Sequence, residues 1–139
     1  MGGRKILVVD DSRTQLLLMA NLLRAHGYDV ITASDGDEAL SRVYAEQPDC
    51  VVLDVVLPKQ NGFQLCRRLK LLDAQCTIPI ILISGNRTPI DQQWGMEQGA
   101  DLFLCKPFSG EELLERCDWF GCRCHQKYPS RFFISMEPS

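Results

Sequence analysis

The sequence predicts a doubly wound α/β domain built on a five-stranded parallel sheet, from two observations. Short apolar runs rich in Val, Ile and Leu alternate along the chain with segments of helical periodicity. The runs are almost continuously apolar, which is typical of parallel strands covered on both faces. Five β-then-α units in series favour right-handed crossovers, with helices on both sides of the sheet. In such sheets ligands bind outside the carboxyl ends of the strands, so we expect functional residues there.

The predicted strands share this apolar composition and are bounded by polar or turn-forming residues. They are Ile6–Val9, Tyr28–Thr32, Cys50–Leu53, Ile80–Ile83 and Leu102–Leu104.

Helix signals fill the intervals between these strands. The first helix follows Ser12, with apolar residues at helical spacing, and Gly27 ends it. Asp35 with Glu38 has the spacing of a capping box that opens the second helix. The residues expected on the buried sides of these two helices are Leu16, Met19, Ala20, Leu23, Ala39, Leu40 and Val43.

The remaining helices are predicted from similar signals. The third runs from about Gly62 to Leu72, the fourth begins at Thr88-Pro89 and ends at Gly99, and a capping box at Ser109 opens the fifth. The apolar positions of the third and fifth helices are Phe63, Cys66, Leu69, Leu72, Leu113, Leu114 and Cys117. Beyond about Phe120 the pattern stops, so we expect a domain over residues 1–120 and a tail over 121–139.

The composition and net charge of the chain limit the kinds of partner and the cellular compartment that we expect. The chain has 139 residues, 45% of them hydrophobic, and a net charge of −3. This charge favours neither nucleic acid nor an anionic membrane surface as a partner. The N-terminus does not read as a secretory signal, and seven cysteines without a disulfide pattern favour a reducing cytoplasm.

Polar side chains stand where the predicted strands end. Asp10 and Asp11 follow the first strand, Asp54 ends the third, Ser84 ends the fourth, and Lys106-Pro107 follows the fifth. We expect them to converge in one crevice, where carboxylates would repel one another unless a cation offset them. Mg²⁺ accepts oxygen ligands and keeps several waters. A carboxylate nucleophile, a hard metal, an ammonium and a hydroxyl together indicate phosphoryl transfer onto the carboxylate.

Four segments at these strand ends resemble the response regulator receiver family, CheY-like, and in particular its single-domain members. They are ILVVDDS at 6–12, VVLDVVLPKQNGF at 51–63, PIILISG at 79–85 and GADLFLCKPF at 99–108. The resemblance covers residues 4–119 and implies a flavodoxin-like strand order, 2-1-3-4-5. It further implies a phosphoryl acceptor, not a turnover enzyme, in a phosphorelay fed by a histidine kinase or phosphotransfer protein.

The resemblance also assigns roles, residue by residue. Asp54 matches the phosphoacceptor, Lys106 the phosphate-pairing lysine, and Ser84 the switch hydroxyl. Asp11, Asp54 and the carbonyl of Val56 match the Mg²⁺ ligands, with Asp10 acting through water. Phe103 matches the switch aromatic, and Lys106–Pro107 matches a cis peptide. The downstream protein target would bind the face made by the fourth helix, fifth strand and fifth helix.

Other readings stay open at this point. An aspartate-nucleophile phosphatase would need a second aspartate two residues after Asp54, where Val56 stands. A phosphate-independent adaptor would keep the fold but not cycle phosphate. The segment around Trp94 is similar to receivers of chemotaxis-like twitching-motility (type IV pilus) systems. Cys117, Cys122, Cys124 and His125 are closely spaced, but their spacing favours free thiols over a structural zinc site.

Overall fold

The computed structural model describes residues 4–57, 62–72, 78–85, 93, 97 and 99–123, and of residues 120–123 it describes the backbone alone. Nine elements follow one another in these ranges. In chain order they are β1 Lys5–Val9, α1 Arg13–Ala25, β2 Asp29–Ala33, α2 Gly36–Glu46, β3 Cys50–Asp54, α3 Gly62–Leu72, β4 Ile80–Ser84, β5 Leu102–Cys105 and α5 Gly110–Arg123.

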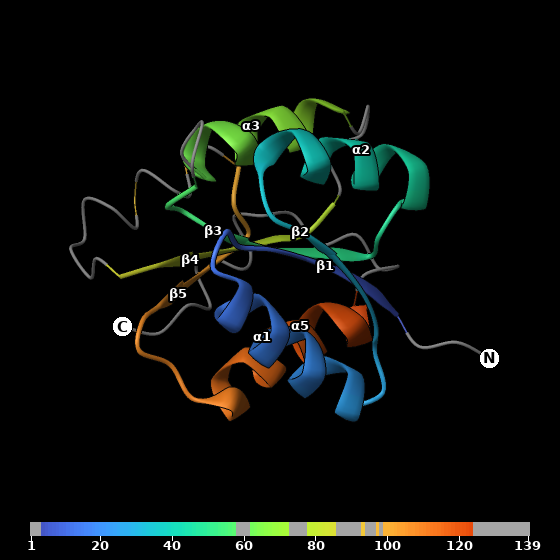
Figure 1. Ribbon diagram of the computed structural model, residues 1–139, viewed down its shortest axis with the longest axis vertical. Coiled ribbons are helices and arrows are strands. Elements are labelled where there is room, and N and C mark those ends of the chain that lie inside the picture. Colours follow the sequence, from blue (N-terminus) through green and yellow to red (C-terminus); the bar gives the residue numbers. More distant parts are fainter. Residues whose placement is uncertain are drawn as a thin grey trace.

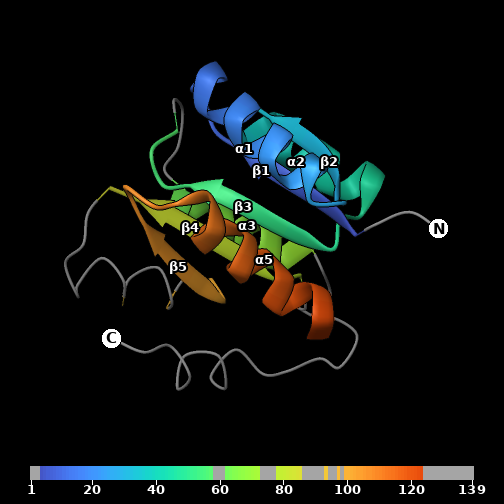
Figure 2. The same ribbon diagram turned by 90° about the horizontal axis from the view of Figure 1, so that it is seen from below.

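The strands form one parallel sheet in the order β2-β1-β3-β4-β5. The predicted fold class and strand order are therefore confirmed, and the ends of each predicted strand are correct to within one residue. Helices α2 and α3 cover one face of the sheet, while α1 and α5 cover the other (Figures 1 and 2). Each layer closes over its own apolar cluster, so the strands are buried on both faces, as their continuous hydrophobicity predicts.

Side-chain caps fix where the helices begin. Ser12 Oγ accepts a hydrogen bond from the amide of Gln15 at the start of α1. Ser109 and Glu112 cap α5 reciprocally, with distances of 2.9 and 3.1 Å between side-chain oxygen and backbone nitrogen. Asp35 accepts from the amide of Glu38 at 2.8 Å. Capping of each orphan amide stabilises a helix start by about 1 kcal/mol.

The buried side of α3 differs from the prediction at its last turn. Leu72 is 47% exposed, whereas Lys70 is only 8% exposed. Lys70 lies four residues after Cys66 and therefore on the same helix face. Its ammonium donates to Asp101 at 2.8 Å and to the carbonyl of Ile78 at 2.6 Å, which satisfies the buried charge.

Two further predictions, the fourth helix and the end of the domain, concern residues outside the described ranges or at their edge. The predicted fourth helix, with Trp94, lies largely outside them, although Gly99 has a φ of 105° that suits a helix end. Helix α5 continues to Arg123, so the predicted domain boundary at residue 120 falls inside a helix. No helix in the described ranges has both the length and the apolar character needed to cross a bilayer.

Candidate functional site

Backbone hydrogen bonds align the strand ends that carry the predicted site residues. The amide of Asp10 donates to the carbonyl of Ala33 at 3.1 Å, just beyond the pairing of β1 with β2. Asp54 stands beside Ile83 in the register of β3 and β4. The amide of Lys106 donates to the carbonyl of Ser84 at 2.8 Å. These ends lie on one edge of the sheet because all five strands are parallel.

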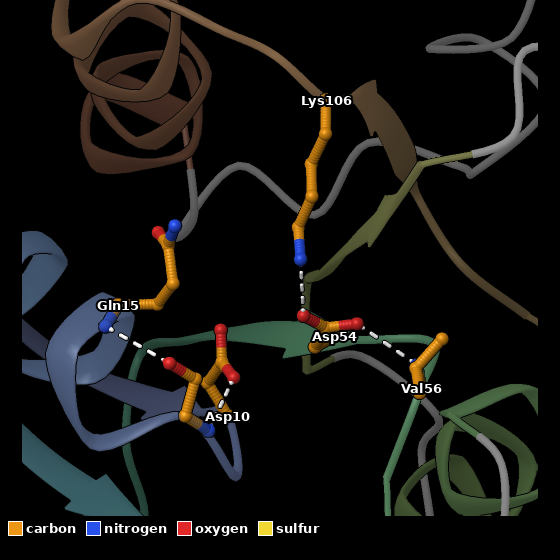
Figure 3. Close-up of polar contacts among 6 residues, drawn as sticks. Asp10, Gln15, Asp54, Val56 and Lys106 are labelled. Atoms are coloured by element: carbon orange, nitrogen blue, oxygen red, sulfur yellow. Dashed lines mark hydrogen bonds and ion pairs between the residues drawn. The ribbon is translucent and has the colours of Figure 1, made fainter.

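Asp54 is held by two donors of different kinds. Its Oδ2 lies 2.7 Å from the ammonium of Lys106, and its Oδ1 accepts from the amide of Val56 at 2.8 Å (Figure 3). The side chain of Asp54 is 5% exposed and that of Lys106 is 36% exposed. The lysine thus reaches from the end of β5 to neutralise a carboxylate buried at the end of β3.

Asp10 is buried beside Asp54 without equivalent support. It is 2% exposed, and its Oδ1 accepts from the amide of Ser12 at 2.9 Å. Its Oδ2 accepts a hydrogen bond from no described group. Burial raises the pKa of Asp10 from 3.8 to about 6, the Asp54 charge adds to the rise, and the Ser12 amide and Lys106 oppose it. The site therefore holds more buried negative charge than Lys106 alone compensates.

The three carboxylates expected in the crevice differ in their burial. Asp10 and Asp54 are buried together, whereas Asp11 is exposed. Across the described ranges, no three His, Cys, Asp or Glu side chains form a group that could hold a metal ion.

The donor chemistry nevertheless fits Mg²⁺. Asp10 presents a buried, unpartnered oxygen next to Asp54, which a hard cation would satisfy. Mg²⁺ commonly binds through one or two carboxylates and keeps several waters, so three converging side chains are not needed.

Ser84 and Phe103 flank the site from β4 and β5. Ser84 is 3% exposed at the end of β4. Phe103 is 4% exposed and belongs to the apolar cluster beneath α2 and α3. The Lys106–Pro107 peptide bond is cis, which is the state that the resemblance implies.

An apolar groove of about 720 Å³ opens on the other side of Lys106, between α1 and the segment that leads into α5. Its walls include Leu18, Leu22 and Phe108, with Gln15 at the polar end. Leu18 is 61% exposed and lines the groove together with Leu22 and Phe108. Leu17 and Leu18 lie outside the buried stripe of α1, so the periodicity of the helix could have marked them as exposed apolar residues.

The described cysteines are all free thiols. Cys50, Cys66 and Cys117 are buried, and Cys105 is half-buried. The side chain of Cys122, and Cys124 and His125 as a whole, lie outside the described residues, so the preference for free thiols over a structural zinc site stays a prediction.

Chemically, the arrangement can accept an electrophilic, anionic group on a carboxylate. Asp54 supplies the nucleophilic oxygen, and Lys106 supplies a positive charge where negative charge would gather. Burial strengthens these electrostatic contacts by lowering the local dielectric.

Comparison with known proteins identifies the family. The model of the response regulator receiver domain matches residues 6–118. The chain is 43% identical over 114 residues to the alkaline phosphatase synthesis transcriptional regulatory protein PhoP of Bacillus subtilis, covering 82% of this chain but 47% of PhoP. It thus spans about half the length of that relative.

Solved structures agree with this match. The chemotaxis response regulator CheY4 of Vibrio cholerae is 31% identical with a TM-score of 0.80, covering 85% of this chain and 98% of that one. The receiver domain of the Francisella response regulator 1452 is 29% identical with a TM-score of 0.81, covering 87% and 98%. The family match spans the strand ends that carry the buried Asp10 and Asp54 and the Lys106 that contacts Asp54, and this chain belongs to the response regulator receiver domain family.

Proposed function

We propose that this chain is a phosphorylation-dependent switch in a two-component phosphorelay, with Asp54 as its phosphoryl acceptor. The observation that supports this most is the buried Asp54 carboxylate, which is 2.7 Å from Lys106 and next to the unpartnered oxygen of Asp10. Receiver domains take phosphoryl groups from histidine kinases or phosphotransfer proteins, and we assign a donor of this class here.

In the proposed step, an oxygen of Asp54 attacks the phosphorus of a phosphohistidine. A P–O bond to Asp54 forms as the P–N bond breaks, and the imidazole leaves with the electron pair and takes up a proton. Lys106 neutralises charge on the equatorial oxygens of the transferring group. The hydroxyl of Ser84 then donates a hydrogen bond to the bound phosphoryl group.

Mg²⁺ is the cofactor that we assign to this step, as receiver domains generally bind it at the phosphorylation site. Asp11, Asp54 and the carbonyl of Val56 would hold it directly, and Asp10 through water. When bound, Mg²⁺ supplies positive charge that stabilises the transferring phosphoryl group.

The output follows from differential contacts at Ser84 and Phe103. A phosphoryl group on Asp54 would favour the conformation in which Ser84 and Lys106 both contact it, and so shift a pre-existing equilibrium. Phe103 lies in β5, three residues before Lys106. We propose that a protein partner reads this change on the face that includes β5 and α5. The stand-alone, chemotaxis and twitching-motility settings expected from the sequence remain predictions.

We further propose that the apolar groove beside Lys106 receives the phosphodonor protein. Lys106 lines the groove and also contacts Asp54, so a protein seated there has direct access to the acceptor. Leu18 and Phe108 offer apolar surface for a helix of the donor. A small phosphodonor would need none of this surface.

The decisive experiment is phosphorylation by acetyl phosphate with Mg²⁺, followed by the intact mass of the protein. We expect one phosphate adduct on the wild type, and none on Asp54→Asn or in the presence of EDTA. Beryllofluoride, which mimics an aspartyl phosphate, should bind the wild type under the same conditions.

Each alternative function gives a different result. Wild-type protein that gains no adduct and binds no beryllofluoride would refute the acceptor role and support an adaptor. Repeated turnover of a phosphomonoester, well beyond one equivalent per chain, would instead support a phosphatase.

A further inference from the structure

The start of α3 lies unusually close to the backbone that carries the acceptor. The amide of Gly62 donates to the carbonyl of Val55 at 2.6 Å. A Cβ added to Gly62 would stand 2.4 Å from the carbonyl oxygen of Asp54 and 2.6 Å from the Cα of Val55. Both neighbours are backbone atoms, so no flexible side chain can move aside to make room.

The requirement for glycine here is steric and not conformational. Among the described residues, the glycines with positive φ are Gly27 and Gly99, and Gly62 is not one of them. An alanine could therefore adopt the backbone conformation of Gly62 but could not occupy its space.

The two sides of this contact are not equally firm. Helix α3 is anchored by the fully buried Leu65 and Leu69, and by the ion pair of Lys70 with Asp101. Strand β3 is fixed by pairing with β1 and β4 as far as Asp54. Beyond it, Val55 still donates to the carbonyl of Ile83, whereas Val56 is 71% exposed and its amide donates to Asp54 itself.

We propose that Gly62 is a positioning residue for Asp54. Its missing side chain lets α3 lie against Asp54 and Val55 and so holds the Val56 amide where it orients the acceptor carboxylate. A methyl group at this position would push the segment after β3 outward, because that segment is the least anchored part of the contact. The consequence for phosphorylation rests on the proposed function, whereas the geometric part does not.

The test compares Gly62→Ala with Gly27→Ala. Gly27 lies between α1 and β2 with a φ of 103° and no atom near its missing Cβ. Its substitution strains the backbone and destabilises the fold without touching the site. Urea unfolding would be used to place both variants on one stability scale. The amide resonance of Val56 and the rate of phosphorylation by acetyl phosphate would then be recorded for folded protein.

In Gly62→Ala we expect a displaced Val56 amide resonance and phosphorylation slowed roughly 10- to 100-fold, as is usual when a reacting group is misplaced. Gly27→Ala should lose stability but keep the wild-type Val56 resonance and rate. A Gly62→Ala protein with the wild-type resonance and a rate within about twofold of wild type would overturn the inference. The inference would also be overturned if phosphorylation of both variants slowed in proportion to the stability that each had lost.

Two further outcomes, a wild type that accepts no phosphate and a Gly62→Ala variant that does not fold, have readouts of their own. If wild-type protein accepts no phosphate, the proposed function fails, and the Val56 resonance alone decides the role of Gly62. If Gly62→Ala does not fold, the wild type is titrated with Mg²⁺. We then expect the amide resonances of Gly62 and Val56 to shift together while that of Gly27 stays unchanged. A Gly62 resonance that does not shift would refute the coupling between Gly62 and Val56.

Discussion

Truncating Leu18 to alanine should weaken phosphorylation by a protein donor and leave phosphorylation by a small donor unchanged. Leu18 is 61% exposed and lines the groove next to Lys106. Full burial of a leucine side chain contributes about 1.5–3 kcal/mol. Covering the exposed 61% of Leu18 would therefore contribute about 1–2 kcal/mol, which corresponds to roughly a 5- to 30-fold loss in the variant.

The assay uses two phosphodonors on the same protein. The first is an autophosphorylated histidine kinase, chosen by screening for transfer to the wild-type chain, with kcat/KM as the readout. The second is acetyl phosphate, which needs no protein contact. Leu17→Ala is the matched control, because Leu17 lies on the same helix, is 46% exposed and does not line the groove.

Equal kcat/KM values for Leu18→Ala and Leu17→Ala with the kinase would refute the docking role of the groove. A loss of the same size with acetyl phosphate would also refute it, since Leu18 would then act on the site itself. Because Leu18 is exposed, its truncation should leave the free energy of unfolding within about 0.5 kcal/mol of wild type.

Three further predictions concern the site. Asp10→Asn should raise the free energy of unfolding by at most about 3 kcal/mol near neutral pH without Mg²⁺, the equivalent of a pKa raised from 3.8 to about 6. Between these two pKa values the folded wild type keeps this proton, whereas the unfolded chain has lost it, so the free energy of unfolding of the wild type should fall as pH rises. Urea unfolding across that pH range should show a growing difference in stability between Asp10→Asn and the wild type. Lys106→Ala should slow phosphorylation by acetyl phosphate roughly 100-fold, since Asp54 loses its cation; an unchanged rate would argue against that role. Val56→Asn should shorten the lifetime of the aspartyl phosphate, because Val56 offers no polar side chain to an attacking water, and an unaltered dephosphorylation rate would contradict this.

The fold was predictable because its signals are local. Each strand is a short apolar run, and the parallel arrangement follows from runs that are buried on both faces. The Ser109 and Glu112 capping box was equally readable, since both partners lie within one turn. Parallel strands then bring Asp10, Asp54 and Lys106 to one edge, although they are far apart in the sequence.

What escaped prediction depends on partners distant in the sequence or on orientation within the site. Lys70 is buried because Asp101 and the carbonyl of Ile78 meet it there, and no local pattern announces those partners. Neighbouring residues such as Asp10 and Asp11 look equivalent in the sequence, yet one is buried and the other exposed. The steric role of Gly62 depends on how closely α3 approaches β3, which the spacing of residues does not determine.

The unbalanced charge at the site links the stability of the fold to the binding of a cation. An unpartnered carboxylate oxygen on Asp10, 2% exposed, disfavours the folded protein when Asp10 is ionised. Any cation that satisfies this oxygen in the folded state alone must therefore stabilise the fold by mass action. The ammonium of Lys106 has three N–H donors, so it can hold Asp54 and also donate to a phosphoryl group bound there. In the proposed function, a phosphoryl group on Asp54 would add a contact at Lys106, and residues 106–109 connect that lysine to the start of α5.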